Sequence, residues 1–253
     1  MVRLTRRPLP PHRVPRRSPW GLYLISDQAM LRDGTFLPFL EKAVVSGVRI
    51  VQLRGKSLPE DVVVPVGMHV RRLTRAHGAA FIVNDRVDLA VRLEADGVHL
   101  GQGDASPEEA RSELGPGRLI GLSTHNRRQI AAAQDRPVDY IGVGPVYSTT
   151  TKENPDPEVG LALIEWACRN SALPVVAIGG ITLENLEPVL RAGARNVAVV
   201  SAIGRSADPL ATTRAFIRRI AAFQPKNAPE PRETAAPNPA SPGGTDLVRE
   251  CPG

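Results

Sequence analysis

The chain has 253 residues, of which 42% are hydrophobic and only 4% aromatic. This length supports one sizeable domain, and a core of Val, Ile, Leu and Ala is typical of parallel strands covered by helices. The formal net charge is +6, but six arginines lie before the first acidic residue, Asp27, so the rest of the chain is close to neutral. The distribution of this charge, confined to the N-terminal residues, therefore argues against a basic nucleic-acid-binding domain.

The ends of the chain differ from its middle in composition. Residues 1–18 are rich in Arg and Pro, and residues 224–253 are rich in Pro, Ala, Glu and Asn. Both segments bury too little apolar surface to offset the entropy of ordering, so we predict disordered arms around one domain at residues 19–223.

Cellular location follows from what the sequence lacks. No apolar run is long enough to span a bilayer, and the N-terminus has no apolar secretory segment. The two cysteines, Cys168 and Cys251, suit neither a disulfide framework nor a cysteine-based zinc site. We expect a cytoplasmic protein with no membrane or nucleic-acid partner, and the sequence leaves a homo-oligomer open.

Apolar runs typical of buried strands alternate with helical patterns across the domain. Strands are predicted at Gly21–Ile25, Arg49–Leu53, Ala80–Val83, Gly97–Leu100, Leu119–Leu122, Tyr140–Val143, Val175–Ile178 and Asn196–Val200. Helices are predicted at Phe36–Ser46, Pro59–His77, from Ser106 onward, and at Asn126–Ala133, Glu158–Arg169, Thr182–Arg191 and Asp208–Phe223. Eight strand–helix units predict an α/β fold, a single (β/α)8 TIM barrel. The alternative, an open doubly wound sheet, lacks support from a GxGxxG turn.

Polar residues follow the second predicted strand. In a barrel, the carboxyl ends of all strands meet at one face, where such enzymes carry their active sites. Strand alternation puts Gln52, Arg54 and Lys56 on one side, where they would form a clamp for an anion. The alternative is a surface turn with solvated charges.

Acidic residues follow the next two strands. Asn84 and Asp85 come after the third strand, and Asp104 comes after the fourth. Two carboxylates, with water and phosphate completing the coordination, are a usual magnesium arrangement. The alternative is that each aspartate caps a helix, and the two roles are compatible.

The run from Gly142 to Lys152 ends an apolar strand in three threonines and a lysine, which suits the binding of phosphate or diphosphate. A solvated threonine-rich loop is the alternative. Gly179 and Gly180 follow the seventh strand, and Val200 and Ser201 follow the eighth, where TIM barrels often bind phosphate.

Two further polar residues lie within or directly after predicted strands. Ser123 offers a hydroxyl after the fifth strand, and His99 lies within the fourth strand in a structural or a catalytic role. No nucleophilic triad and no Schiff-base lysine is evident. The pattern indicates two anion sites in one mouth and a reaction in which a metal and cations stabilise a departing diphosphate.

Residues 23–203 strongly resemble the thiamine phosphate synthase (thiamine-phosphate pyrophosphorylase) family. The resemblance rests on separated motifs that occur in order: Gln52-Leu53-Arg54-Gly55-Lys56, Asn84-Asp85-Arg86, Asp96-Gly97-Val98-His99-Leu100-Gly101-Gln102 with Asp104, Gly121-Leu122-Ser123, Gly144-Pro145-Val146 with Thr149-Thr150-Thr151-Lys152, Gly179-Gly180-Ile181, and Val200-Ser201. Gly55 departs from the acidic or polar residue often expected there.

The resemblance implies a transferase that joins hydroxymethylpyrimidine diphosphate to hydroxyethylthiazole phosphate, giving thiamine phosphate and diphosphate by a Mg²⁺-assisted dissociative substitution. It implies metal ligands at Asp85 and Asp104 and catalytic roles for Lys56, Ser123 and Lys152. The pyrimidine substrate would be bound by Gln52, Arg54, Lys56, Asn84, Ser123 and Lys152, and the thiazole phosphate by Thr149, Thr151, Gly180, Val200 and Ser201.

Two alternative functions are also possible for such a barrel. A thiazole tautomerase shares the barrel but is expected to lose the diphosphate site, whereas this chain keeps Lys56, Asp85, Asp104 and Lys152. A non-catalytic phosphate-binding barrel, with the basic arm recruiting an acidic partner, is disfavoured by the intact pair of aspartates.

Overall fold

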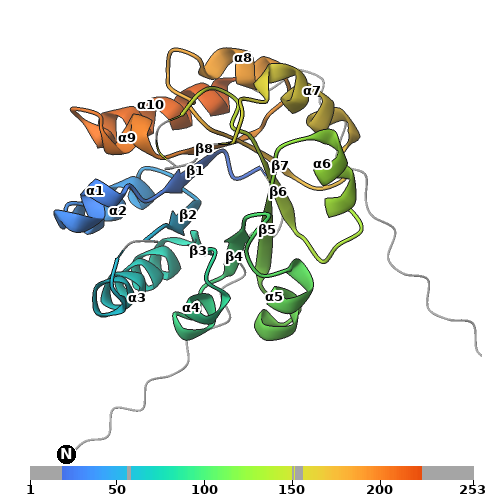
Figure 1. Cartoon of the computed structure of the whole chain (residues 1–253). Coiled ribbons are helices and arrows are strands. Elements are labelled where there is room, and N and C mark those ends of the chain that lie inside the picture. The colour runs from blue at the N-terminus through green and yellow to red at the C-terminus, as the bar shows by residue number, and fades with distance from the viewer. Residues whose placement is uncertain (1–18, 56–57, 150, 152–155, 224–253) are drawn as a thin grey trace, which may run out of the picture. The chain divides into compact units, whose positions relative to one another are not determined.

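Eight parallel strands form a closed barrel, in chain order, in the computed structural model of the protein (Figure 1). The structure describes residues 19–55, 58–149, 151 and 156–223. The strands are β1 (Leu22–Ile25), β2 (Ile50–Leu53), β3 (Ala80–Asn84), β4 (Gly97–Leu100), β5 (Leu119–Thr124), β6 (Tyr140–Val143), β7 (Val175–Ile178) and β8 (Asn196–Val199). The pairing of Leu22 with Val197 closes β1 onto β8. The predicted TIM barrel is confirmed, and the predicted terminal arms lie outside the described residues.

Helices connect the strands and cover the outside of the barrel (Figure 1). They are α1 (Gln28–Arg32), α2 (Phe36–Val45), α3 (Glu60–His77), α4 (Val87–Arg92), α5 (Pro107–Leu114), α6 (Arg127–Ala133), α7 (Gly160–Asn170), α8 (Leu186–Arg191), α9 (Ser201–Gly204) and α10 (Pro209–Ala222). Within the described part of the chain, no helix is both long and apolar enough to cross a membrane.

Local sequence signals explain where several helices begin. The capping box of Ser106 and Glu109 starts α5, and Asp208 caps α10 with its carboxylate. The prediction that a helix opens at Thr182 was wrong. The Asn185 side chain accepts from Thr182 N at 2.7 Å and donates to Gly180 O at 2.9 Å, so a turn occupies these residues and α8 begins at Leu186.

Strand alternation divides the core into two layers. Residues pointing outward from the strands, such as Leu24, Phe81 and Ile141, pack against the helices. The residues of the inner layer are Trp20, Tyr23, Ile25, Ile50, Ala80, Ile82, Leu119, Tyr140, Val176 and Ala198. The barrel is therefore packed with side chains rather than hollow, as is usual for this fold.

Polar side chains join neighbouring strands at their amino ends. Asp96 accepts from Phe81 N of β3 and from Arg71, each at 2.8 Å. Asp139 likewise accepts from Ile120 N of β5 at 2.8 Å and from Arg111 at 2.6 Å. We call these two arrangements the aspartate clips. They secure the end of the barrel opposite to the candidate site.

Candidate active site

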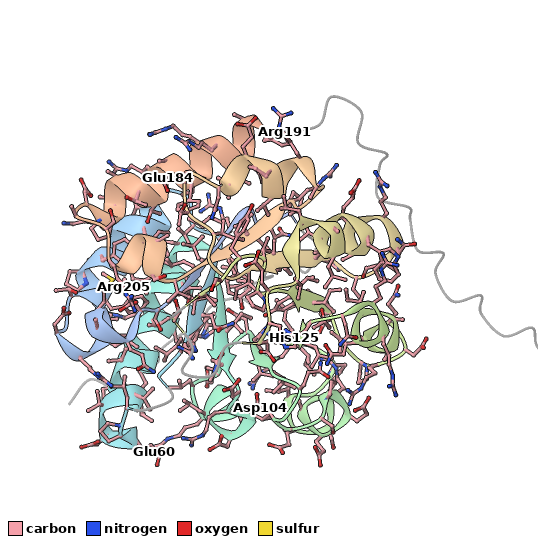
Figure 2. The ribbon with its side chains drawn as sticks, turned by 45° about the horizontal axis from the view of Figure 1, so that its top comes forward. Glu60, Asp104, His125, Glu184, Arg191 and Arg205 are labelled. Atoms are coloured by element: carbon pink, nitrogen blue, oxygen red, sulfur yellow. The ribbon has the colours of Figure 1, made fainter. Side chains whose placement is uncertain are left out.

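A cavity of about 220 Å³ lies at the carboxyl ends of the strands, and residues from every strand line it. The lining includes each predicted site residue that the structure describes: Gln52, Arg54, Asn84, Asp85, Asp104, Ser123, Thr149, Thr151, Gly180, Val200 and Ser201. The predicted catalytic residues Lys56 and Lys152 lie outside the described residues. Figure 2 shows Asp104 and His125 on the part of the barrel that β4 and β5 form.

The two predicted metal ligands line the same cavity from neighbouring strand ends. Asp85 directly follows β3 with a φ of 62°, a left-handed conformation that turns the chain sharply and that aspartate tolerates better than most residues. The Asp104 Oδ2 atom accepts from Gly101 N at 2.8 Å, which folds the loop after β4 back onto itself. Neither aspartate is the N-cap of a helix, since Arg86 precedes α4 and Ser106 caps α5.

The carboxylate oxygens of Asp85 and Asp104 are ligands of the kind that a magnesium ion prefers. Two carboxylates at the edge of an open cavity leave coordination positions for water and for phosphate oxygens, as this hard cation prefers. Among the described residues there is no cluster of three or more His, Cys, Asp or Glu side chains able to hold a metal. A cation at Asp85 and Asp104 would complete its coordination with water and with oxygens of a bound substrate.

Arg54 is the only lysine or arginine among the described residues lining the cavity. Its backbone N–H donates to Ser26 Oγ at 2.8 Å, which ties the chain leaving β2 to the chain leaving β1. Gln52, two residues earlier in β2, is buried and lines the cavity beside it. The arrangement presents one cation, on an anchored backbone, and one amide to a ligand.

A group of hydroxyls lies on the other side of the cavity. Thr151 N donates to Thr149 Oγ1 at 3.3 Å, and the Thr151 hydroxyl donates to Ser201 Oγ at 3.2 Å. These bonds join the loop after β6 to the start of α9. Gly180 approaches the same loop closely, because a Cβ atom there would lie 2.9 Å from Tyr147 Cβ, and its φ is 63°. The chain needs glycine at this position.

The floor of the cavity holds a hydrogen-bond chain that the sequence analysis missed. It connects Gln52 to Tyr23, Tyr23 to Tyr140, Tyr140 to His99 and His99 to Ser123, with lengths between 2.9 and 3.1 Å. Burial lowers the pKa of His99 to about 4 and raises the pKa values of Tyr23 and Tyr140, so all three rings are neutral at pH 7. In the sequence, the signal that could have revealed this hydrogen-bond chain was the presence of polar residues at inward-facing positions of the strands.

His125 and Asp156 are further lining residues that were not predicted as site residues. His125 Nδ1 lies 2.6 Å from Gly144 O, and its Nε2 lies 3.6 Å from Asp156 Oδ2. The histidine thus connects the end of β5 with both ends of the loop that carries Thr149 and Thr151. Only the signal of a polar residue after a strand pointed to His125.

Comparison with known proteins points to one family. A sequence profile described as thiamine monophosphate synthase matches residues 22–203. A thiamine-phosphate synthase of Thermosynechococcus vestitus is 43% identical over 189 residues, covering 75% of this chain and 54% of the relative. A thiamine biosynthesis bifunctional protein of Geobacter sulfurreducens is 42% identical over 213 residues, covering 84% of this chain and 41% of the relative.

A solved structure agrees with the sequence matches. The thiamine phosphate pyrophosphorylase of Pyrococcus furiosus superposes with a TM-score of 0.73 at 31% identity, over 81% of this chain and 96% of that one. The chain spans about half the length of the curated relatives it matches. From the profile, which covers most of the barrel, and from these relatives, we conclude that the chain belongs to the thiamine monophosphate synthase family.

Proposed function

We propose that the chain is a thiamine-phosphate synthase, a transferase that joins hydroxymethylpyrimidine diphosphate to hydroxyethylthiazole phosphate and releases diphosphate. The observation that carries this proposal is the division of one cavity into two polar sets. Arg54, Asp85 and Asp104 follow β2, β3 and β4, while Thr151 and Ser201 follow β6 and β8. Because the strands close in chain order, the two sets occupy different arcs of the ring, which suits two phosphorylated substrates.

The arc from β2 to β4 would take the pyrimidine diphosphate. Arg54 provides a guanidinium for phosphate oxygens, and Asn84 provides an amide. Asp85 and Asp104 would hold Mg²⁺. When bound, this ion neutralises negative charge on a leaving diphosphate. Lys56 and Lys152 are proposed to bind the same group, on the basis of the family resemblance alone.

The arc from β6 to β8 would take the thiazole phosphate. The hydroxyls of Thr149, Thr151 and Ser201 are already connected by hydrogen bonds, so they are ordered before a phosphate arrives. The close approach of Gly180 and the turn at Val200 keep the backbone near this group. Neutral donors suit a phosphate that is held throughout the reaction and does not leave.

The reacting rings would lie between the two arcs, against the apolar lining residues Ile25, Val176, Ile178 and Ala198. We propose substitution with dissociative character. The carbon–oxygen bond breaks, the diphosphate departs with the electron pair, and the pyrimidine ring stabilises the cation. The thiazole nitrogen then forms the new carbon–nitrogen bond. Apolar walls protect the cation from capture by water until the thiazole attacks.

The direct test incubates the full chain with both substrates and Mg²⁺ and measures thiamine phosphate and diphosphate together. Equal amounts of both products are expected. Diphosphate without thiamine phosphate would indicate hydrolysis, and isomerisation of the thiazole alone would indicate a tautomerase. The absence of any turnover would favour a non-catalytic phosphate-binding barrel. The Arg54→Ala variant serves as the low-activity control.

Location and assembly stay predictions from the sequence: a cytoplasmic protein, able to form a homo-oligomer. Light scattering of the purified full chain, with and without both substrates, measures its oligomeric state.

A further inference from the structure

The hydrogen-bond chain on the cavity floor joins five strands of the barrel. Gln52 Nε2 lies 2.9 Å from the Tyr23 hydroxyl, which lies 2.9 Å from the Tyr140 hydroxyl. Tyr140 lies 3.1 Å from His99 Nδ1, and His99 Nε2 lies 3.0 Å from Ser123 Oγ. Four of these residues line the cavity, whereas Tyr140 is fully buried beneath it. Tyr140 therefore influences a bound substrate only through the residues that it contacts.

The hydrogen-bond chain has a direction of donation, because each of its groups has few hydrogens to donate. A neutral imidazole donates at one ring nitrogen and accepts at the other. If His99 Nδ1 accepts from Tyr140, then His99 Nε2–H donates to Ser123, and the serine hydrogen is directed elsewhere. If His99 Nδ1 donates to Tyr140 instead, the serine hydrogen is used by His99. The proton position on His99 thus decides what Ser123 offers to a substrate.

The other end of the chain selects between these two directions. The Gln52 amide nitrogen can only donate, so the Tyr23 oxygen accepts from it. Within the described residues, the remaining partner of the Tyr23 hydroxyl is Tyr140. When Tyr23 donates to Tyr140, and Tyr140 donates to His99, both tyrosine hydrogens have an acceptor, and only the Ser123 hydrogen is left to point out of the hydrogen-bond chain. The opposite direction leaves the Tyr23 hydrogen without an acceptor in the chain, which is costly at a buried site.

Packing holds the two central rings in this geometry. The ring centroids of His99 and Tyr140 are 5.5 Å apart, and the Trp20 ring meets Tyr140 edge-on at 5.3 Å. A Cβ atom at Gly142 would lie 3.1 Å from His99 Cε1, and one at Gly121 would overlap both rings. Two glycines on neighbouring strands therefore make the space in which the chain forms.

We propose that Tyr140 is a positioning residue that, through His99, fixes the Ser123 hydroxyl as a hydrogen-bond donor to an acceptor atom of the pyrimidine diphosphate. The identity of that substrate rests on the proposed function. The direction of the chain does not, since it follows from the contacts of the protein alone. A serine hydroxyl fixed as a donor can still accept one further hydrogen bond, so it is able to hold the substrate at two points.

The first experiment measures the protonated nitrogen of His99 by NMR of the full chain with ¹⁵N-labelled histidine, assigned with the His99→Gln variant. We expect the proton on Nε2 in the wild-type protein. Tyr140→Phe removes the donor to Nδ1 and is expected to give a mixture of both tautomers. Tyr23→Phe removes an equally buried hydroxyl, but the Tyr140 hydrogen then has His99 Nδ1 as its remaining acceptor, so Nε2 should stay protonated. A wild-type proton on Nδ1, or the same spectrum for Tyr140→Phe, would overturn the proposal.

The second experiment asks whether Tyr140 acts through Ser123. Tyr140→Phe is expected to lower kcat/KM for the pyrimidine diphosphate about tenfold in the wild-type background and less than twofold in the Ser123→Ala background. An equal loss in both backgrounds would mean that Tyr140 only supports the structure, which contradicts the proposal. If the wild-type protein makes no thiamine phosphate, the proposed function fails while the NMR result still decides the direction of the chain.

Discussion

The Thr151 hydroxyl donates to Ser201 Oγ at 3.2 Å, although 50 residues separate the two in the sequence. This bond joins the loop after β6 to the start of α9 and orders the group of hydroxyls that we assign to the thiazole phosphate. Between the described residues of these two loops no backbone hydrogen bond is found, so side chains make the connection.

Removal of the Thr151 hydroxyl should weaken the binding of one substrate and not of the other. Thr151→Val is expected to raise KM for the thiazole phosphate about tenfold, because it deletes a phosphate donor and the bond to Ser201, while KM for the pyrimidine diphosphate changes less than twofold. Steady-state kinetics with each substrate varied in turn measures this difference. Thr35→Val, which removes an exposed hydroxyl bonded to Asp33, is the matched control. Equal effects on both KM values would separate Thr151 from the thiazole site.

The carboxylates after β3 and β4 should control the use of magnesium. Asp85→Asn and Asp104→Asn keep the shape of the side chain but remove its charge, so we expect kcat to fall about a hundredfold or more. Calorimetry should show that Mg²⁺ no longer strengthens diphosphate binding. Asp88→Asn, an exposed carboxylate paired with Arg86 outside the cavity, is the control and should retain wild-type behaviour. Unchanged magnesium dependence in both cavity variants would remove them from the metal site.

Burial of His99 should make the stability of the fold depend on pH. Its pKa in the folded protein is about 4, lowered from 6.5 by burial, so the unfolded chain binds more protons between these values. The contribution of His99 to the free energy of unfolding is fully present above about pH 6.5. It is lost as the pH falls towards 4, and the total loss is about 3 kcal/mol. Urea unfolding at several pH values measures this slope.

His99→Gln should flatten that slope between pH 4 and 6.5, since it removes the partly buried imidazole. His77→Gln, at the exposed last residue of α3, should leave it unchanged. Identical slopes for the wild type and the His99 variant would show that His99 is not the group responsible.

The space beside the central rings gives a prediction about packing. Gly121→Ala would force Tyr140 and His99 to move, so we expect it to lower the unfolding free energy by about 2 kcal/mol. Gly103→Ala adds the same methyl group where no atom lies within 4 Å, and its effect should stay within about 1 kcal/mol. Urea unfolding of both variants provides the comparison. Equal stability of the two variants would mean that the rings move aside at little cost.

The strands were predictable because a buried parallel strand is a short apolar run between polar or glycine residues. The predicted bounds of Gly97–Leu100, Tyr140–Val143 and Val175–Ile178 agree with the structure. The short helices α1, α4 and α9 were not predicted, since four to six residues do not complete two helical turns and give no clear periodicity.

The candidate site was predictable only in part, for a related reason. Residues directly after strands were expected at one face, and topology alone then gathers them around one cavity. The partnership of Tyr23, Tyr140 and His99 depends on a closed ring that brings β1, β4 and β6 together, and inside a strand each tyrosine looks like an ordinary core aromatic. Register and closure, rather than local pattern, create the floor of the cavity.

The aspartate clips divide the barrel into consecutive modules. Asp96 ties β4 to β3, and Asp139 ties β6 to β5, so each clip lies within an odd–even strand pair. A circular permutant opened between β4 and β5 would keep both clips within continuous segments, whereas one opened between β3 and β4 would separate Asp96 from the strand it secures. The β3–β4 and β5–β6 segments are accordingly natural units for recombining this barrel with a relative.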